Sequence, residues 1–488
     1  MNLGRCSGIL LHITSLPGAF GIGDLGPESR WFADALATAG QKLWCILPVG
    51  PTGDENSPYQ SRSAFAGNVL LINPAELVNA GYLASRELKP LPRFPRAVVD
   101  FARVRRWKTE LLRRAHAGFS ENQAYQEFES VNAWWLEAFA QFMALREANR
   151  GISWTRFDSR IKAPEELVRF HKFTQYEFDR QWRVLRSHCE KRGVSLLGDM
   201  PFYVEHDSAD VWSHPQNFDL DEAGEPRTVG GVPPDYFSED GQRWGTPTYR
   251  WDCLEASGFK WWVDRMRTAL DRTPFLRLDH FRGFESYWSV PADQPTARDG
   301  HWAPGPGARL FEVLRKEFGT LPIVAENLGV ITHEVDELRR QFGLPGMAVL
   351  QFGFDDDLRH RPCYYIPETV AFTGTHDNDT TCGWWRSSLR AAHSGKDSAA
   401  RLRVARATAY LQQGAQHPIN WSCLQAVYTS VANVAVVPMQ DVLGLPNKAR
   451  MNIPGKAKGN WRWRLEEKQL RPELLQRLRQ LTEVTGRC

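Results

Sequence analysis

The sequence of 488 residues has no long apolar run, no paired-cysteine motif and almost no net charge. No stretch of about 18 apolar residues is present, so we expect neither a transmembrane helix nor a membrane partner. The apolar run at residues 9–11 is too short for the core of a secretory signal. The eight cysteines are widely separated and form no C-x-x-C pair, which argues against zinc ribbons and thioredoxin-like chemistry. We therefore expect a cytoplasmic protein with free thiols.

Charge is nearly balanced, with 60 basic and 57 acidic residues and a formal net charge of +3. No basic run is interleaved with aromatic residues, so the chain offers no electrostatic surface for nucleic acid. No cluster of side chains at metal-ligand spacing is evident, and we expect no metal and no cofactor. The 19 Trp residues are numerous. They suit either a helical core or stacking against sugar rings, and composition does not choose between these uses.

Eight apolar segments have the length and residue types of buried strands. Most are separated by segments with helical periodicity, as expected for parallel strands covered by helices. The candidates lie at 8–17, 43–48, 194–201, 274–284, 321–326, 347–352, 369–377 and 433–438. Eight strand–helix units that close on themselves predict an α/β fold, a (β/α)8 barrel, with an open doubly wound sheet as the competing arrangement.

Two long segments interrupt this alternation of predicted strands and helices. Residues 1–75 are expected to form the first part of the barrel and 193–488 its remainder, ending in a helix from about Glu467 to Thr485. Between them, 76–192 predicts an inserted, mainly helical subdomain whose Trp and Phe stripes indicate helix packing. Residues 202–256 are rich in Gly, Pro, Asp and aromatics, which predicts a long irregular loop acting as a lid.

The segment 274–284 contains Arg277 and Asp279, two residues apart on a predicted strand. Side chains at this spacing share one face of a strand, and the cation would hold the carboxylate ionised and available as a nucleophile. Taken alone, an Arg-x-Asp pair is more often a structural ion pair.

Three acids follow three different predicted strands: Asp279, Glu326 and Asp377. The carboxyl ends of barrel strands meet at one mouth, so these side chains can flank one bond. Retaining glycoside chemistry needs two carboxyl groups about 5 Å apart, one as nucleophile and one as acid and then base. Burial and like-charged neighbours would raise the pKa of the acid.

The motifs around these acids resemble those of the α-amylase clan and, more specifically, the amylomaltases, the 4-α-glucanotransferases of glycoside hydrolase family 77. The matching segments span nearly the whole chain and lie at 11–17, 21–26, 57–59, 198–201, 232–237, 277–283, 374–380 and 450–455. The resemblance implies a (β/α)8 barrel enzyme that cleaves α-1,4-glucans with retention. It would transfer the segment to the 4-hydroxyl of another glucan or of glucose.

The resemblance also implies roles for individual residues. Asp279 would be the nucleophile, Glu326 the acid/base, and Asp377 the residue that stabilises the distorted sugar in the transition state. Substrate-binding roles are implied for Ser57, Tyr59, Arg277, His280, His376, Asn327 and Asn452, with Asp235, Tyr236, Phe237, Gln242 and Trp244 in a loop arching over the glucan. Two positions depart from the family pattern: Asn327 stands where Asp is usual, and Lys456 where a small hydroxyl residue is common.

The three acids serve transfer and hydrolysis equally, because both pass through a glycosyl-enzyme. An apolar and aromatic lid at 231–244 would exclude water and favour transfer, as the resemblance does. The alternatives are an α-amylase-type hydrolase and a catalytically silent glucan-binding protein, which would be expected to lack at least one of the three acids. We expect a monomer that binds α-1,4-glucans as donors and glucose as acceptor.

Overall fold

A computed structural model describes residues 4–234, 239–394, 397–411 and 418–488. Eight parallel strands close into a barrel in the order β1-β12-β11-β10-β9-β6-β3-β2. They are β1 (Cys6–Leu10), β2 (Leu43–Cys45), β3 (Ser195–Met200), β6 (Phe275–Leu278), β9 (Ile323–Ala325), β10 (Gly346–Val349), β11 (Thr369–Phe372) and β12 (Val434–Pro438). Every barrel strand overlaps one of the eight predicted segments, although β1 and β10 begin two residues and one residue earlier than predicted, so the (β/α)8 prediction is confirmed and the open sheet is wrong.

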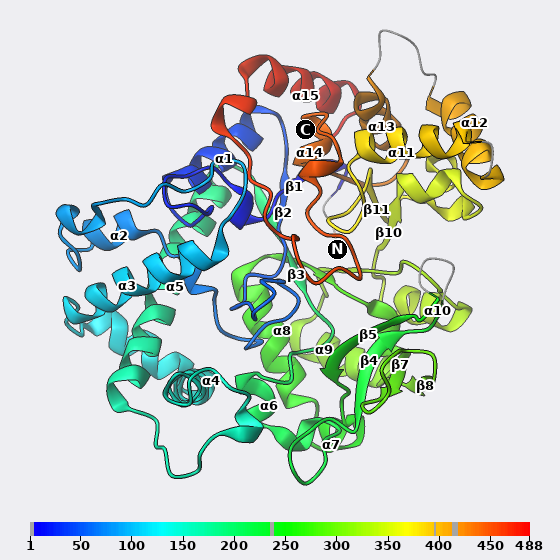
Figure 1. Cartoon of the computed structure of the whole chain (residues 1–488). Helices are drawn as coiled ribbons and strands as arrows, with labels where there is room; N and C mark the ends of the chain where they lie inside the picture. Colours follow the sequence, from blue (N-terminus) through cyan, green and yellow to red (C-terminus); the bar gives the residue numbers. More distant parts are fainter. Residues whose placement is uncertain (1–3, 235–238, 395–396, 412–417) are drawn as a thin grey trace.

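Helices surround the barrel and fill the segments between its strands (Figure 1). They are α1 (Pro27–Thr38), α2 (Pro74–Asn79), α3 (Phe101–Ala117), α4 (Gln123–Ala148), α5 (Glu165–Lys191), α6 (Ala209–Ser213), α7 (Trp251–Ala256), α8 (Lys260–Arg272), α9 (Ala308–Phe318), α10 (His333–Gln341), α11 (Thr381–His393), α12 (Ser398–Leu411), α13 (Ile419–Tyr428), α14 (Met439–Val442) and α15 (Pro472–Val484). Among the described residues, no helix is both long and apolar enough to cross a membrane.

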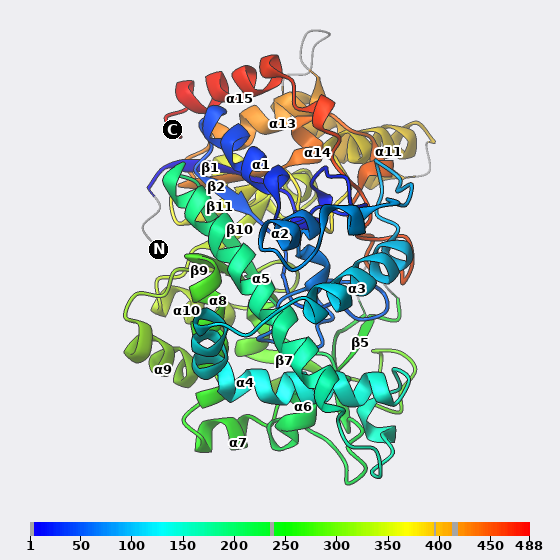
Figure 2. The same ribbon diagram turned by 90° about the vertical axis from the view of Figure 1, so that its left-hand side faces the viewer.

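The segment between β2 and β3 contains the two longest helices, α4 and α5, which pack against each other. Phe128, Trp135, Phe139 and Phe142 of α4 are buried, as the helix-packing prediction expects, whereas Trp134, in the same stripe, is 51% exposed. Helix α5 also contacts α1 and β3, so it joins the helical layer around the barrel (Figure 2). The insertion between the strands is therefore anchored to the barrel through α5.

Residues 202–256 are not the irregular loop that the sequence predicts. They include α6, α7 and two strands, β4 (Thr228–Val232) and β5 (Gln242–Pro247). These strands join β7 (Ser286–Pro291) and β8 (His301–Pro304) in an antiparallel sheet of order β5-β4-β7-β8 (Figure 1). The prediction was wrong because the partners of β4 include β7, which lies far along the chain, and because Gly230 and Gly231 hide the strand pattern.

The glycines at 21, 23 and 26 have the spacing of a dinucleotide-binding fingerprint. However, β1 ends at Leu10, well before them, and a 3-10 turn at 13–15 intervenes. A Cβ at position 23 would lie 1.9 Å from the Ile13 carbonyl oxygen, and one at position 26 would lie 2.0 Å from Asn73 Nδ2. Close packing of the loop against its neighbours therefore accounts for the glycines at 23 and 26.

A buried ion pair holds this loop to α3. The ammonium of Lys108 donates to Asp24 Oδ2 (3.0 Å) and to the carbonyl oxygens of Leu70 (2.8 Å) and Ile72 (2.9 Å). Asp24 Oδ1 accepts a further hydrogen bond from Asn73 Nδ2 (2.7 Å). Only 1% of the Lys108 side chain and 4% of the Asp24 side chain are exposed, so either charge would be left without compensation if the other were removed.

We expect Lys108→Met to lower the free energy of unfolding by about 3–5 kcal/mol, because it leaves the Asp24 carboxylate buried and unpaired. The measurement is urea-induced unfolding followed by tryptophan fluorescence. The control is Arg30→Met, which breaks the more exposed Arg30–Glu76 pair and should cost at most about 1 kcal/mol. Equal losses in the two variants would contradict the assigned role of Lys108.

Candidate active site

Arg277 lies on β6 and Asp279 directly follows it. One guanidinium nitrogen of Arg277, Nη1, lies 2.9 Å from Asp279 Oδ1 and 2.8 Å from both carboxylate oxygens of Asp199, which lies on β3. The Asp279 backbone N–H donates to the Met200 carbonyl (3.0 Å) at the end of β3. The predicted Arg277–Asp279 pair therefore exists, but Arg277 divides its charge between two carboxylates.

Glu326 follows β9 and is held by the loop that follows β6. Its Oε2 accepts from the His280 backbone N–H and its Oε1 from that of Leu328, both at 2.8 Å. His280 adopts the left-handed conformation (φ 50°), which is unusual for a residue other than glycine and occurs often at functional sites. In this conformation the His280 N–H points at the Glu326 carboxylate.

Burial raises the pKa of Glu326 to about 7. The nearby charge of Asp279 raises it further, while Arg277 and the two backbone N–H groups oppose the shift. A carboxyl group with this pKa carries a proton in a large fraction of molecules near neutral pH, as a general acid requires.

Asp377 follows β11 and is held by Asn452, from another segment of the mouth, and by its own neighbour His376. Asn452 Nδ2 donates to its Oδ1 (2.6 Å), and His376 Nε2 lies 3.4 Å from its Oδ2. Burial favours the neutral acid, but the charge and hydrogen bond of His376 outweigh it and hold the pKa of Asp377 below its usual range. Because 45% of the Asp377 side chain is exposed, solvent weakens this shift.

Tyr59 connects the two sides of the mouth. Its hydroxyl donates to Asp199 Oδ2 (2.7 Å), and its ring stacks on that of His376 with centroids 5.1 Å apart. Trp461, which has φ 64°, lies with its ring centroid 5.9 Å from each of these two rings. The contacts Asp279–Arg277–Asp199–Tyr59–His376–Asp377 therefore form a continuous chain between two of the three predicted acids.

Of the predicted lid residues, some lie on a strand and others lie outside the described residues. Gln242 and Trp244 lie on the ordered strand β5, not in a loop, and the Trp244 ring meets the His280 ring edge to face at 4.9 Å. Asp235, Tyr236 and Phe237 lie outside the described residues. Strand β5 thus places one predicted binding residue directly against another.

Two further predicted binding residues interact with nearby backbone. Ser57 Oγ accepts from the Tyr59 N–H (3.3 Å), and Asn327 Oδ1 accepts from the Met347 N–H (2.7 Å) at the start of β10. The side chain of Asn327 thus ties the Glu326 loop to the neighbouring barrel strand.

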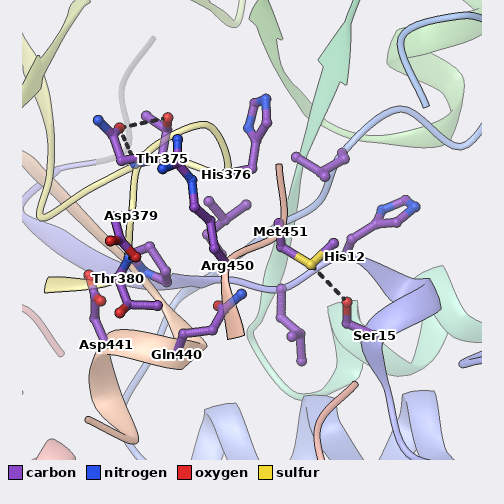
Figure 3. A pocket seen from close by; sticks show the side chains of 15 residues that line it. His12, Ser15, Thr375, His376, Asp379, Thr380, Gln440, Asp441, Arg450 and Met451 are labelled. Carbon is purple, nitrogen blue, oxygen red and sulfur yellow. Dashed lines mark hydrogen bonds between the residues drawn. The ribbon is translucent and has the colours of Figure 1, made fainter. Parts of the chain in front are cut away.

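Three residues without a role in the sequence analysis help to build the site: Asp199, Arg450 and Trp461. Arg450 Nε donates to the Asn452 carbonyl (2.6 Å), and its Nη2 donates to the Asp377 carbonyl. Figure 3 shows Arg450 in the lining of a pocket with Thr375, His376 and Asp379. Asp199 and Arg450 lie within the family-like segments 198–201 and 450–455, so the sequence contained a signal for them. Nothing in the sequence pointed to Trp461. Among the residues described, no group of three or more His, Cys, Asp or Glu side chains could hold a metal.

Comparison with known proteins decides the family. The family model described as 4-alpha-glucanotransferase, of glycoside hydrolase family 77, matches residues 11–470. The chain is 46% identical to the 4-alpha-glucanotransferase of Thermus thermophilus over 512 aligned residues, with all of both chains covered. The chain belongs to the 4-alpha-glucanotransferase family. A relative from Solanum tuberosum, a chloroplastic/amyloplastic 4-alpha-glucanotransferase, is 40% identical, with 94% of this chain and 82% of the relative covered.

A solved structure supports the same assignment. Amylomaltase from Streptococcus agalactiae in complex with acarbose superposes with a TM-score of 0.93 at 36% identity, with 99% of each chain covered. The predicted family, barrel fold and enzyme class are therefore confirmed, and the chain is an enzyme that transfers glucan segments. Neither a hydrolase nor a catalytically silent binding protein is supported by these relatives.

We expect the Asn327→Asp variant to shift the alkaline limb of the kcat/KM–pH profile to higher pH than in the wild type. The added carboxylate can accept the same Met347 hydrogen bond, but its charge beside Glu326 raises the pKa of the acid. The general-acid role expected of Glu326 needs the protonated carboxyl group, so a higher pKa would preserve activity to higher pH. The initial rate of transfer from maltotriose between pH 5 and 9 measures this, and coincident profiles would contradict it.

Proposed function

We propose that this glucanotransferase cleaves α-1,4-glucans with retention, with Asp279 as nucleophile, Glu326 as acid/base and Asp377 as the residue that stabilises the transition state. One observation carries most of the proposal: a carboxyl group with a raised pKa, Glu326, is hydrogen-bonded by the loop that bears an arginine-paired carboxylate, Asp279. Two carboxyl groups in different charge states are what retaining glycoside chemistry requires.

In the first step, an Asp279 carboxylate oxygen attacks the anomeric carbon as the glycosidic bond breaks. Glu326 gives its proton to the departing oxygen, which becomes the free 4-hydroxyl of the leaving glucan. Arg277 holds Asp279 in place, and Asp377 binds hydroxyl groups of the distorted sugar. The product is a glycosyl-enzyme with Glu326 ionised.

In the second step, the 4-hydroxyl of another glucan or of glucose enters from the side of Glu326. Glu326 takes the hydroxyl proton as the oxygen bonds to the anomeric carbon, and the bond to Asp279 breaks. Segment 231–244, part of which forms β4 and β5, covers the glucan and keeps water away from the intermediate. Exclusion of water favours a sugar acceptor over hydrolysis.

Contacts in the mouth support binding roles for the predicted residues. His280 Nε2 is buried without a partner among the described residues, and burial lowers the pKa of His280 to about 4, so the ring is neutral and can exchange a hydrogen bond with a sugar hydroxyl. The Trp244 ring meets this ring edge to face, which supports a binding role for both residues at one place. Tyr59 and His376 present adjacent aromatic surfaces for the same sugar. The streptococcal amylomaltase was solved with acarbose, and we propose glucan binding in the same mouth here.

All eight cysteines are free, which supports a cytoplasmic location. We also propose that the enzyme acts as a monomer, that 76–192 is an insertion in the barrel, and that no cofactor takes part.

Incubation with pure maltotriose tests the proposed function. We expect glucose and a ladder of longer maltooligosaccharides, resolved by chromatography, because each transfer lengthens one chain as it shortens another. The isosteric Asp279→Asn variant should lose roughly 10⁴-fold or more in kcat, since it removes the nucleophile. The control is Asp252→Asn, an exposed position on α7. Reducing ends gained without a ladder, or a nearly active Asp279→Asn, would overturn the proposal.

A further inference from the structure

Trp302 is a large aromatic side chain on the edge strand β8 of the antiparallel sheet, and 38% of it is exposed. The guanidinium carbon of Arg282 lies over this ring, 3.8 Å from its centroid. Because Arg282 covers one face of the indole, the exposed part belongs to its edges and its other face. A tryptophan held in this way offers an apolar surface to solvent at a defined position.

The stack is tied to both catalytic loops. Arg282 belongs to the turn at Phe281–Phe284 that directly follows Asp279 and His280. Its Nη1 donates to the Val330 carbonyl (2.6 Å), in the loop that follows Glu326, and its Nη2 to Ser286 Oγ (3.4 Å). Its Nε–H has no acceptor in the part of the chain that the structure describes, and the indole face covers the cation instead. Through Arg282, Trp302 is therefore connected to the loops of the proposed nucleophile and the proposed acid/base.

A second tryptophan fixes the ring from the side. Trp288 on β7 is the register partner of Trp302, and the two rings meet at 71° with centroids 5.2 Å apart. Trp288 is itself held by a hydrogen bond from its Nε1 to the Ala297 carbonyl (2.8 Å). A ligand that stacks on Trp302 would thus find a side chain that is already ordered, at little cost in conformational entropy.

We propose that Trp302 is a stacking site for a glucosyl residue on the acceptor side of the cleavage point. A hexose presents an apolar C–H face that matches an exposed indole, and the enzyme acts on chains of such residues. The acceptor side is favoured because Arg282 connects the ring to the loop of Glu326, the group that serves the leaving and entering oxygens. This inference rests on the roles proposed above for Asp279 and Glu326.

The site would serve long acceptors and not glucose. The length of the Arg282 side chain separates the ring from the catalytic loop, so a single glucose beside Glu326 would not reach it. An acceptor of several residues would place a later glucosyl unit on the indole. Trp302 would then set the preference of the enzyme for acceptor length.

The test uses glucose and maltotetraose labelled at the reducing end as acceptors of segments from unlabelled amylose. The rate of label extension gives a KM for each acceptor. We expect Trp302→Ala to raise the ratio of the maltotetraose KM to the glucose KM about three- to tenfold, the effect of losing one aromatic stacking contact. Trp302→Phe should keep most of the wild-type ratio because it retains an aromatic face.

Matched variants separate stacking from structural damage. Trp302→Leu fills apolar volume without an aromatic face and should behave like Trp302→Ala, while Tyr364→Ala, at another exposed aromatic (54% exposed), should keep the wild-type ratio. The thermal unfolding midpoint of each variant is measured alongside. An unchanged ratio in folded Trp302→Ala or Trp302→Leu, or an equal rise of both KM values, would overturn the proposal.

Binding measurements make the result independent of turnover. Calorimetric affinity for maltotetraose is compared in the Asp279→Asn protein with and without Trp302→Leu. The stacking site predicts a loss of affinity by the same three- to tenfold factor, even if the proposed reaction roles fail. Equal affinities would refute the stacking site and leave those roles untouched.

Discussion

The Arg277 guanidinium lies inside the barrel mouth between two carboxylates, the buried Asp199 and the partly exposed Asp279. Loss of the cation would leave two like charges close together, and loss of Asp199 would leave the cation with Asp279 as its acidic contact. Asp199 also accepts a hydrogen bond from Tyr59, which stacks on His376, the partner of Asp377. One buried cation thus determines the placement of groups on both sides of the mouth.

The proposed nucleophile and the proposed acid are linked through the backbone. His280, in a left-handed conformation, directs its N–H to Glu326, and the N–H of Phe281 donates to the Glu326 carbonyl (3.1 Å). Burial and the charge of Asp279 still raise the pKa of Glu326 to about 7. The two carboxyl groups are therefore held by one turn, and the raised pKa of Glu326 suits the acid that the proposed reaction needs.

Local patterns predicted more of the fold than of the site. Short buried strands such as β10 and β12 depend on runs of apolar residues that are visible in one segment, so all eight barrel strands were found. Strands β4 and β5 were missed because they are stabilised partly by β7, which is remote in sequence. The same reason explains why Trp461 was missed: its place beside Tyr59 and His376 depends on a loop more than 80 residues after His376.

By itself, the sequence determined the barrel and the family, and it predicted the three acids, because strand periodicity and short motifs are properties of contiguous residues. Only the tertiary structure decided that Arg277 is shared with Asp199, that β5 brings Trp244 against His280, and that Arg450 holds the backbone beside Asp377. Such contacts depend on distances of a few ångströms between groups on different strands and loops. Closure of the barrel and the packing of the insertions on its mouth set those distances. The sequence of any one segment is not enough to fix them.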